Sequence, residues 1–198
     1  MKFSAFQKEM KKPAFTFAEA QIVAHDQGRE VLRLSLHRWA SRGDLIRVRR
    51  GVYAFADRPV SLPETIDILY PPAYMSLESA LNQHGLLPDV SFELTVVTTR
   101  PTRSFETIWG RFRFHKIQRE LFLGFDPETK LAIPEKALLD WFYFRGTRFV
   151  DAPAFWKETR LQNLEQIRWK EGDALSKLYP QEKIRTLWKG LKRYAKTA

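Results

Sequence analysis

Residues 29–55, with the sequence REVLRLSLHRWASRGDLIRVRRGVYAF, combine a helical pattern with a strand pattern, and both are basic on one side. The first half predicts a helix over residues 29–42, because its apolar side chains recur every three or four positions and fall on one side of a helix. These apolar side chains are Leu32, Leu36, Trp39 and Ala40. Gly43 is expected to end this helix.

The second half of this stretch predicts a β-hairpin over residues 45–55. Ile46 and Val48 alternate with Arg47 and Arg49, which is the two-residue period of a strand. Gly51 permits the tight reversal between the two strands. The hairpin is therefore expected to have a basic outer face.

Two shorter helices are predicted before this stretch. The first covers residues 3–11, and the second begins after Thr16, which forms a capping box with Glu19 and marks a helix start. Gly28 is expected to stop the second helix as a C′ glycine. The order helix, helix, turn, helix, hairpin is that of a winged helix-turn-helix, in which the helix after the turn enters the major groove and the hairpin lies against the phosphates.

The first third of the chain holds most of its excess positive charge. The protein has 198 residues with 33 Lys and Arg against 23 Asp and Glu, a formal charge of +10, and residues 1–58 alone carry 12 against 6. Such an excess favours a polyanionic partner such as nucleic acid. The candidate DNA-binding residues are Arg29, Arg33, His37, Arg38, Arg42, Arg47, Arg49 and Arg50. The alternative is an ordinary solvated helix face, but two adjacent elements would then both be basic by chance.

A domain boundary is predicted within residues 57–63, where two prolines interrupt both periodicities. Residues 1–58 form the winged helix, and residues 59–198 form a mixed domain with a small sheet and C-terminal helices, so the fold class is α+β. The elements expected in the second domain are a helix capped by Ser76 and closed by Gly85, a strand over residues 92–99, a hairpin over 104–117 turning near Gly110, a short strand over 130–133 and a helix over 135–144.

Three further features of the second domain lead to expectations. The helix over residues 135–144 is apolar nearly all round and should be buried, with Lys136 and Asp140 paired on its one wet edge. Phe112 and Phe114 should point to one side of the hairpin, and Arg111, Arg113 and His115 should point to the other. A possible second basic patch comprises Arg100, Arg103, Arg111 and Arg113, for which a solvated sheet face is an equally good interpretation.

The tail from Pro180 is an amphipathic basic helix, and residues 183–198 contain six Lys and Arg and no acid. It could dock on the second domain, bind nucleic acid as an arm, or lie on a membrane surface. We favour docking, since lysine stems cover apolar surface while their charges stay in water.

Composition excludes several classes of protein. A chain that is 44% hydrophobic and 14% aromatic is not disordered. Without cysteine there is no disulfide or thiolate chemistry, and the four histidines lack metal-ligand spacing, so we expect neither metal nor cofactor. The segment MKFSAFQKEMKK has no apolar run, and the stretch ALLDWFYF at 137–144 is too short to span a bilayer. We therefore expect a cytoplasmic protein that does not enter membranes.

The strongest catalytic alternative is a metal-dependent nuclease of the PD-(D/E)xK kind. Asp89, Glu128 and Lys130 have the required residue types in the required order, since such enzymes hold Mg²⁺ with two carboxylates and use the lysine on the attacking water. The pattern is short, and Asp126-Pro127 before Glu128 favours a turn. We expect a protein that is not an enzyme.

Three strings resemble one family. HRWASRGDLIRVRRGVYAF (37–55), YMSLESALNQHGL (74–86) and AIPEKALLDWFY (132–143) are similar, in this order, to motifs of the AbiEi-type transcriptional regulators, the antitoxins of bacterial abortive-infection toxin–antitoxin operons. The resemblance covers about Thr16 to Phe144. It implies binding to promoter DNA, repression of the protein's own operon, and neutralisation of a nucleotidyltransferase-like toxin without implying a stable complex with it. A winged-helix regulator with no toxin partner is the remaining alternative.

Overall fold

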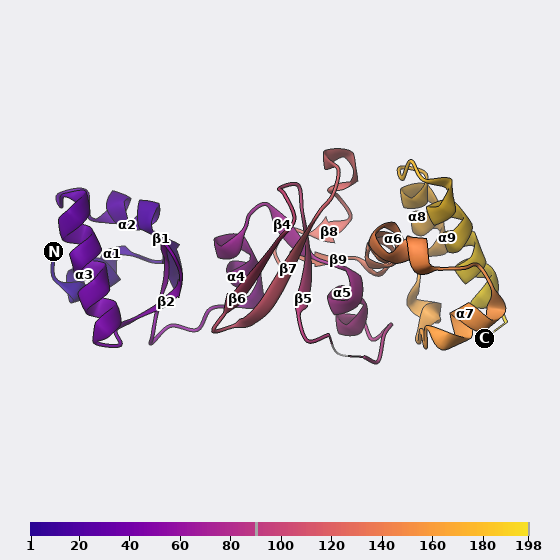
Figure 1. Ribbon diagram of the computed structural model, residues 1–198, viewed down its shortest axis with the longest axis horizontal. Helices are drawn as coiled ribbons and strands as arrows, with labels where there is room; N and C mark the ends of the chain where they lie inside the picture. Colours follow the sequence, from indigo (N-terminus) through magenta and orange to yellow (C-terminus); the bar gives the residue numbers. More distant parts are fainter. Residues whose placement is uncertain (90, 198) are drawn as a thin grey trace. The chain divides into compact units, whose positions relative to one another are not determined.

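The computed structural model describes residues 1–89 and 91–197, which form two compact units (Figure 1). The first unit comprises Met1–Pro71 and Thr107–Trp109, and the second comprises the described residues of 72–106 and 110–197. Each unit contains helices and a β-sheet, so the predicted mixture of helix and strand is confirmed.

The first unit surrounds a three-stranded antiparallel sheet with helices. Its elements are α1 (Phe3–Glu9), β1 (Ala14–Thr16), α2 (Phe17–Val23), α3 (Arg29–Ser41), β2 (Leu45–Arg49), β3 (Val52–Phe55) and α4 (Leu62–Leu69). The strand order is β1-β3-β2. The hairpin reverses at Gly51, whose φ of +77° lies in the region that favours glycine. The predicted hairpin over residues 45–55 is thus confirmed.

The start of α2 follows the sequence, but its end does not. Thr16 Oγ1 accepts a hydrogen bond from the Glu19 backbone N–H (3.2 Å), and the Glu19 carboxylate accepts one from the Thr16 N–H (2.7 Å), which completes the predicted capping box. The prediction for Gly28 was wrong, because α2 already ends at Val23 and Gly28 is the N-cap of α3 with a φ of −61°. The residues between these two helices form the turn that separates them.

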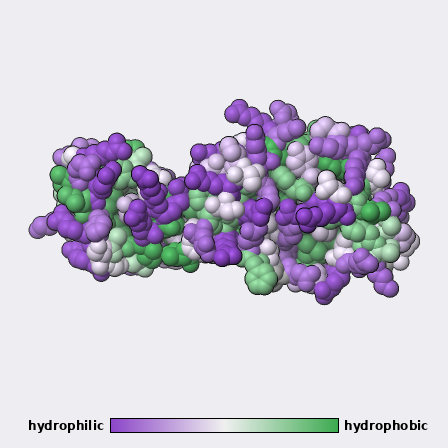
Figure 2. Space-filling model, viewed as in Figure 1, coloured by the Kyte–Doolittle hydropathy of each residue, from purple (hydrophilic) through white to green (hydrophobic). Residues whose placement is uncertain are grey.

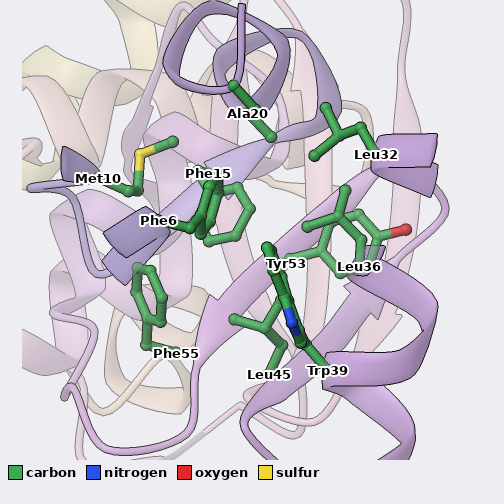
Figure 3. Packing of buried hydrophobic residues seen from close by; sticks show 11 residues of the cluster. Phe6, Met10, Phe15, Ala20, Leu32, Leu36, Trp39, Leu45, Tyr53 and Phe55 are labelled. Atoms are coloured by element: carbon green, nitrogen blue, oxygen red, sulfur yellow. The ribbon is translucent and has the colours of Figure 1, made fainter. Parts of the chain in front are cut away.

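Aromatic rings fill the core of the first unit (Figure 3). Phe15 lies 5.3 Å from both Phe6 and Phe55, measured between ring centroids, and Trp39 of α3 lies 5.1 Å from Phe6. Leu32 and Leu36 of α3 are fully buried among them, as the helical period predicts. The core therefore holds one side of α3 against the sheet and leaves the opposite side to solvent.

The second unit is built on a six-stranded sheet of order β6-β7-β5-β4-β9-β8. Its strands are β4 (Ala73–Met75), β5 (Leu94–Thr98), β6 (Arg103–Thr107), β7 (Gly110–Lys116), β8 (Phe125–Asp126) and β9 (Leu131–Ala132). Its helices are α5 (Leu77–Gln83), α6 (Pro134–Arg145), α7 (Pro153–Glu158), α8 (Trp169–Ser176) and α9 (Glu182–Tyr194), with 3₁₀ turns η1 (Arg119–Leu121), η2 (Gly146–Arg148) and η3 (Leu164–Gln166). β5 pairs antiparallel with β4 and parallel with β7.

Helix α6 is buried as predicted, but its charged pair is not on a wet edge. Lys136 and Asp140 are 1% and 0% exposed, and the Lys136 ammonium lies 2.5 Å from the Asp140 carboxylate. Tyr74, Ser76 and Tyr179 each donate a hydroxyl hydrogen bond to the Asp140 carboxylate. The expectation of a solvated pair was wrong, because residues distant in sequence cover this side of α6.

The basic C-terminal helix α9 docks on the second unit, which confirms the interpretation we favoured. It buries an apolar side consisting of Ile184, Leu187, Trp188 and Leu191. α9 packs against α6, α7 and α8. In Figure 2, hydrophilic residues cover most of the visible face.

Candidate nucleic-acid interface

A basic pocket of about 500 Å³ lies between α3 and the β2–β3 hairpin. We call it the basic pocket. It is lined by Phe17, Arg29, Arg33, His37, Ala40, Arg47, Arg50, Gly51 and Tyr53. Five of the eight residues predicted to bind DNA therefore meet in one concavity.

Local structure explains how the basic pocket is built. Arg29, Arg33 and His37 recur at four-residue spacing, so they follow one another along the solvent side of α3. The Phe17 backbone N–H donates to the Gly51 carbonyl (2.8 Å), which fixes the start of α2 to the hairpin turn. The Arg29 guanidinium lies 5.6 Å from the centre of the Phe17 ring, within cation–π range.

The basic pocket is electrostatically unbalanced. Four arginines line it, and none of its described lining residues is acidic. Arg33 makes a 3.9 Å ion pair with Glu30 of the same helix, but both side chains are more than half exposed. Such an exposed pair contributes little and is readily exchanged. The pocket can therefore accept an anion such as a phosphate or the acceptor atoms of a guanine edge.

The other three predicted residues do not line the basic pocket. Arg38 is exposed on a different side of α3 and donates to the Ser35 hydroxyl (3.4 Å). Arg42 binds the Asp44 carboxylate through two nitrogens (2.9 and 2.6 Å). Arg49 follows an irregularity in the pairing of β2 with β3, and donates to the Leu69 carbonyl at the end of α4 (2.9 Å).

Two aromatic residues of the basic pocket, Phe17 and Tyr53, were not among the predicted site residues. Phe17 directly follows the cap Thr16, so the capping box was the signal that placed it at a helix start. Tyr53 stands on β3 opposite Arg47 of β2, a pairing fixed by the hairpin register. Both residues could have been found from the sequence by placing the predicted hairpin beside the predicted start of α2.

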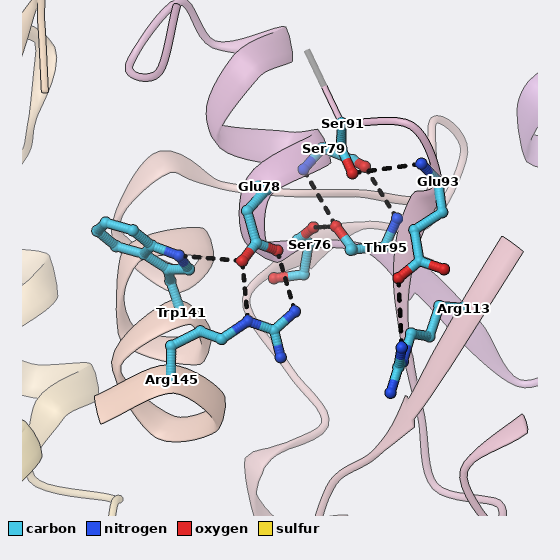
Figure 4. A network of polar contacts seen from close by, with 9 residues as sticks. All are labelled: Ser76, Glu78, Ser79, Ser91, Glu93, Thr95, Arg113, Trp141 and Arg145. Carbon is cyan, nitrogen blue, oxygen red and sulfur yellow. Dashed lines mark hydrogen bonds and ion pairs between the residues drawn. The ribbon is translucent and has the colours of Figure 1, made fainter. Parts of the chain in front are cut away.

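The four arginines of the possible second patch are all exposed, but two of them are partly neutralised. Arg111 makes a 3.0 Å ion pair with Glu106, and Arg113 makes a 3.5 Å pair with Glu93 (Figure 4). The Arg103 guanidinium lies 5.2 Å from the Phe105 ring centre, and Arg100 follows β5. Arg103 belongs to β6, and Arg111 and Arg113 belong to the neighbouring strand β7.

His115 belongs to the same strand β7 as Arg111 and Arg113 but is buried, with 6% of its surface exposed. Burial, together with the nearby positive charges of Arg145 and Arg113, lowers the pKa of His115 to about 4. Phe112 and Phe114 are buried on the other side of the strand, as predicted. His115 is therefore neutral at pH 7 and adds no charge to this face.

The residues of the nuclease alternative lie in loops. Asp89 follows α5 and forms a 3.4 Å ion pair with Arg160. Glu128 and Lys130 occupy the turn between β8 and β9, where the Asp126 carboxylate accepts a hydrogen bond from the Glu128 N–H (2.8 Å). Within residues 1–89 and 91–197, no three His, Asp or Glu side chains are grouped so that they could hold a metal ion. Across the same residues, no helix is both long and apolar enough to cross a membrane.

Residues 8–56 match the family model described as "Transcriptional regulator, AbiEi antitoxin". The resemblance stated from the sequence is thereby confirmed over these residues, which include the first of its three strings. Among solved structures, the crystal structure of the RV2827C protein from Mycobacterium tuberculosis is similar, with 13% identity and a TM-score of 0.47 over 91% of this chain and 77% of that one. No curated protein sequence matches the chain.

Proposed function

We propose that this AbiEi-like chain represses its own operon by binding promoter DNA through a winged helix-turn-helix, and that it acts as antitoxin to a nucleotidyltransferase-like toxin. The observation that carries the DNA-binding part is the basic pocket, in which four arginines and His37 converge with no acidic lining residue in the described chain. The family match over the same segment supports the regulatory role. The protein would be a cytoplasmic binding protein and not an enzyme.

In the proposed complex, α3 enters the major groove and the β2–β3 hairpin lies along the phosphates. Arg33 and His37, near the middle of α3, are then placed to contact base edges, where an arginine can bind guanine with two hydrogen bonds. Arg47 and Arg50 of the hairpin region would contact phosphates, which fix position and do not read sequence. Arg38, Arg42 and Arg49 would contribute less, because each donates to a neighbouring group of the protein.

We propose the same division of labour that the sequence suggests, with residues 1–58 binding DNA and 59–198 carrying the antitoxin activity. Helix α4 is a structural extension of the first unit, since Arg49 bonds to the Leu69 carbonyl. The candidate antitoxin surface is the second patch of Arg100, Arg103, Arg111 and Arg113. A regulator with no toxin partner is the alternative, and the presence or absence of a toxin gene beside this one discriminates between them.

The DNA-binding proposal predicts a strong dependence on salt. If the basic pocket and its flanking arginines neutralise about four to six phosphates, the logarithm of the binding constant should fall against the logarithm of salt concentration with a slope of about −4 to −5. Fluorescence anisotropy with the promoter duplex across a salt series measures this slope. A slope near −1 would contradict the proposed interface.

The antitoxin proposal predicts that the two activities separate. Alanine at Arg100, Arg103, Arg111 and Arg113 together should reduce growth rescue in cells that co-express the neighbouring toxin, and should leave repression of a promoter reporter unchanged. The matched control places alanine at four exposed charged residues of the same unit away from this sheet region, Lys157, Lys170, Lys183 and Lys189. Equal rescue by the patch variant and the wild type, at equal protein levels, would remove the patch from the proposal.

A further inference from the structure

The crest of α3 is the row of residues that lies opposite the buried side of this helix. Leu32, Leu36 and Trp39 hold the buried side against the core of the first unit (Figure 3). On an α-helix, the residues farthest from such a side recur at a spacing of three or four positions. The crest consists of Glu30, Leu34, His37 and Ser41, all of which are exposed.

Leu34 differs in chemistry from the rest of the crest. It is apolar and 62% exposed, whereas the other three crest residues are polar or charged. Its neighbours one turn later on the helix are His37 and Arg38, and Arg33 directly precedes it. Single exposed leucines are common on protein surfaces, so exposure alone assigns no function. The informative feature of Leu34 is its position, in the middle of the crest and next to three of the predicted DNA-binding residues.

The major groove of DNA offers an apolar side chain a suitable partner. The base edges present hydrogen-bond acceptors and donors, and among them the C5 methyl group of thymine is apolar. The side chain of leucine makes no hydrogen bonds, so placing it over an acceptor or donor leaves a buried polar atom unpaired, which costs free energy. Placing it against the methyl group removes apolar surface of both partners from water. A leucine that faces the floor of the groove therefore favours thymine.

We propose that Leu34 determines sequence specificity by contacting the C5 methyl group of a thymine in the operator. This inference rests on the proposed function, because it takes α3 to be the helix that enters the major groove with its crest toward the base edges. Arg33 and His37 beside it are placed to make the hydrogen bonds that a leucine cannot make. Glu30, one turn earlier on the crest, can accept a hydrogen bond from a cytosine amino group.

Removal of single methyl groups from the DNA tests this contact. The probe is a duplex of the promoter region of this gene in which thymines are replaced, one at a time, by deoxyuridine. Deoxyuridine pairs with adenine as thymine does and lacks only the C5 methyl group. Fluorescence anisotropy measures binding of the full-length protein. At one or a few positions, deoxyuridine should weaken wild-type binding by about three- to fivefold, the loss expected for one buried methyl group.

The variant Leu34→Ala shows whether Leu34 is the partner of this methyl group. The variant should fold, which circular dichroism checks, because alanine favours helix and the replaced side chain is exposed. It should bind the unmodified duplex more weakly than the wild type does, and deoxyuridine at the sensitive positions should no longer change its affinity. The matched control is Leu178→Ala, which removes a 49% exposed leucine of the second unit and should keep the sensitivity of the wild type.

A cytosine series separates the methyl group from the rest of the thymine base. Replacing the thymine–adenine pair at a sensitive position by cytosine–guanine should weaken wild-type binding. Replacing that cytosine by 5-methylcytosine should strengthen wild-type binding by about three- to fivefold and leave the affinity of Leu34→Ala unchanged. If 5-methylcytosine bound the wild type no better than cytosine, the methyl contact would be refuted.

The outcomes distinguish this inference from the proposed function. If the wild type bound the promoter duplex but no deoxyuridine changed its affinity, the inference would be wrong and the proposed DNA binding would stand. The same conclusion would follow from equal losses in the wild type and in Leu34→Ala at the sensitive positions. If the wild type bound the promoter duplex no better than a duplex of random sequence, the proposed function would fail, and this inference with it.

Discussion

Replacement of Asp140 by alanine is expected to lower the free energy of unfolding by about 3–5 kcal/mol, the usual cost of removing one partner of a buried ion pair. The change leaves the ammonium of Lys136 buried without a counterion. Burial already lowers the pKa of Lys136, and the charge of Asp140 opposes this effect. The Asp140→Ala substitution also leaves the hydroxyls of Tyr74, Ser76 and Tyr179 without their common hydrogen-bond acceptor. Urea denaturation followed by tryptophan fluorescence measures the loss, because four of the six tryptophans are in the second unit.

A matched control shows how much of the lost stability is due to the burial of the ion pair and how much to the loss of one charge. Glu106→Ala breaks the ion pair with Arg111, in which both side chains are about two-thirds or more exposed, and should cost less than about 1 kcal/mol. If Asp140→Ala were no more destabilising than Glu106→Ala, the buried network would not stabilise the fold. The double change of Lys136→Met with Asp140→Leu should recover part of the loss, since apolar pairs often replace buried ion pairs without penalty.

Alanine at Arg29, Arg33, Arg47 and Arg50 together is expected to weaken operator binding by roughly a thousandfold. The four side chains line the basic pocket, and at about 1 kcal/mol for each lost contact their removal costs about 4 kcal/mol. The salt dependence should weaken in parallel, with the slope falling by about one for each lost phosphate contact. Anisotropy titrations of the variant and the wild type at several salt concentrations give both quantities.

The matched control for this variant removes the same number of charges from the other unit. Alanine at Arg100, Arg103, Arg111 and Arg113 lowers the net charge equally, so it reports how much of the loss is due to general charge. The affinity of this control variant for the operator should be within a few fold of the wild-type affinity. Similar losses in both variants would mean that net charge, and not the basic pocket, holds the DNA.

The sequence by itself predicted those parts of the fold whose interactions are local. The capping box of Thr16 and Glu19, the apolar side of α3 and the hairpin turn at Gly51 each depend on residues within a few positions of one another. Such patterns are visible in a single sequence because helix and strand periods and turn conformations are properties of short segments. For the same reason five of the eight predicted DNA-binding residues meet in the basic pocket, since α3 and the hairpin are adjacent along the chain.

Tertiary structure decided the features that depend on residues far apart in the sequence. Lys136 and Asp140 have the spacing of an exposed helix pair, and they are buried because Tyr179, 39 positions after Asp140, covers them. Arg49 fits the alternation of a basic strand, but its partner is the Leu69 carbonyl, 20 positions later. One pocket of the second unit is lined by residues of both α5 and α7, which 69 residues separate. The periodicity of a segment shows which of its sides is apolar, but the packing of the whole chain decides which other segment covers each side. Packing can therefore bury a charged pair that the local pattern predicts to be exposed to water.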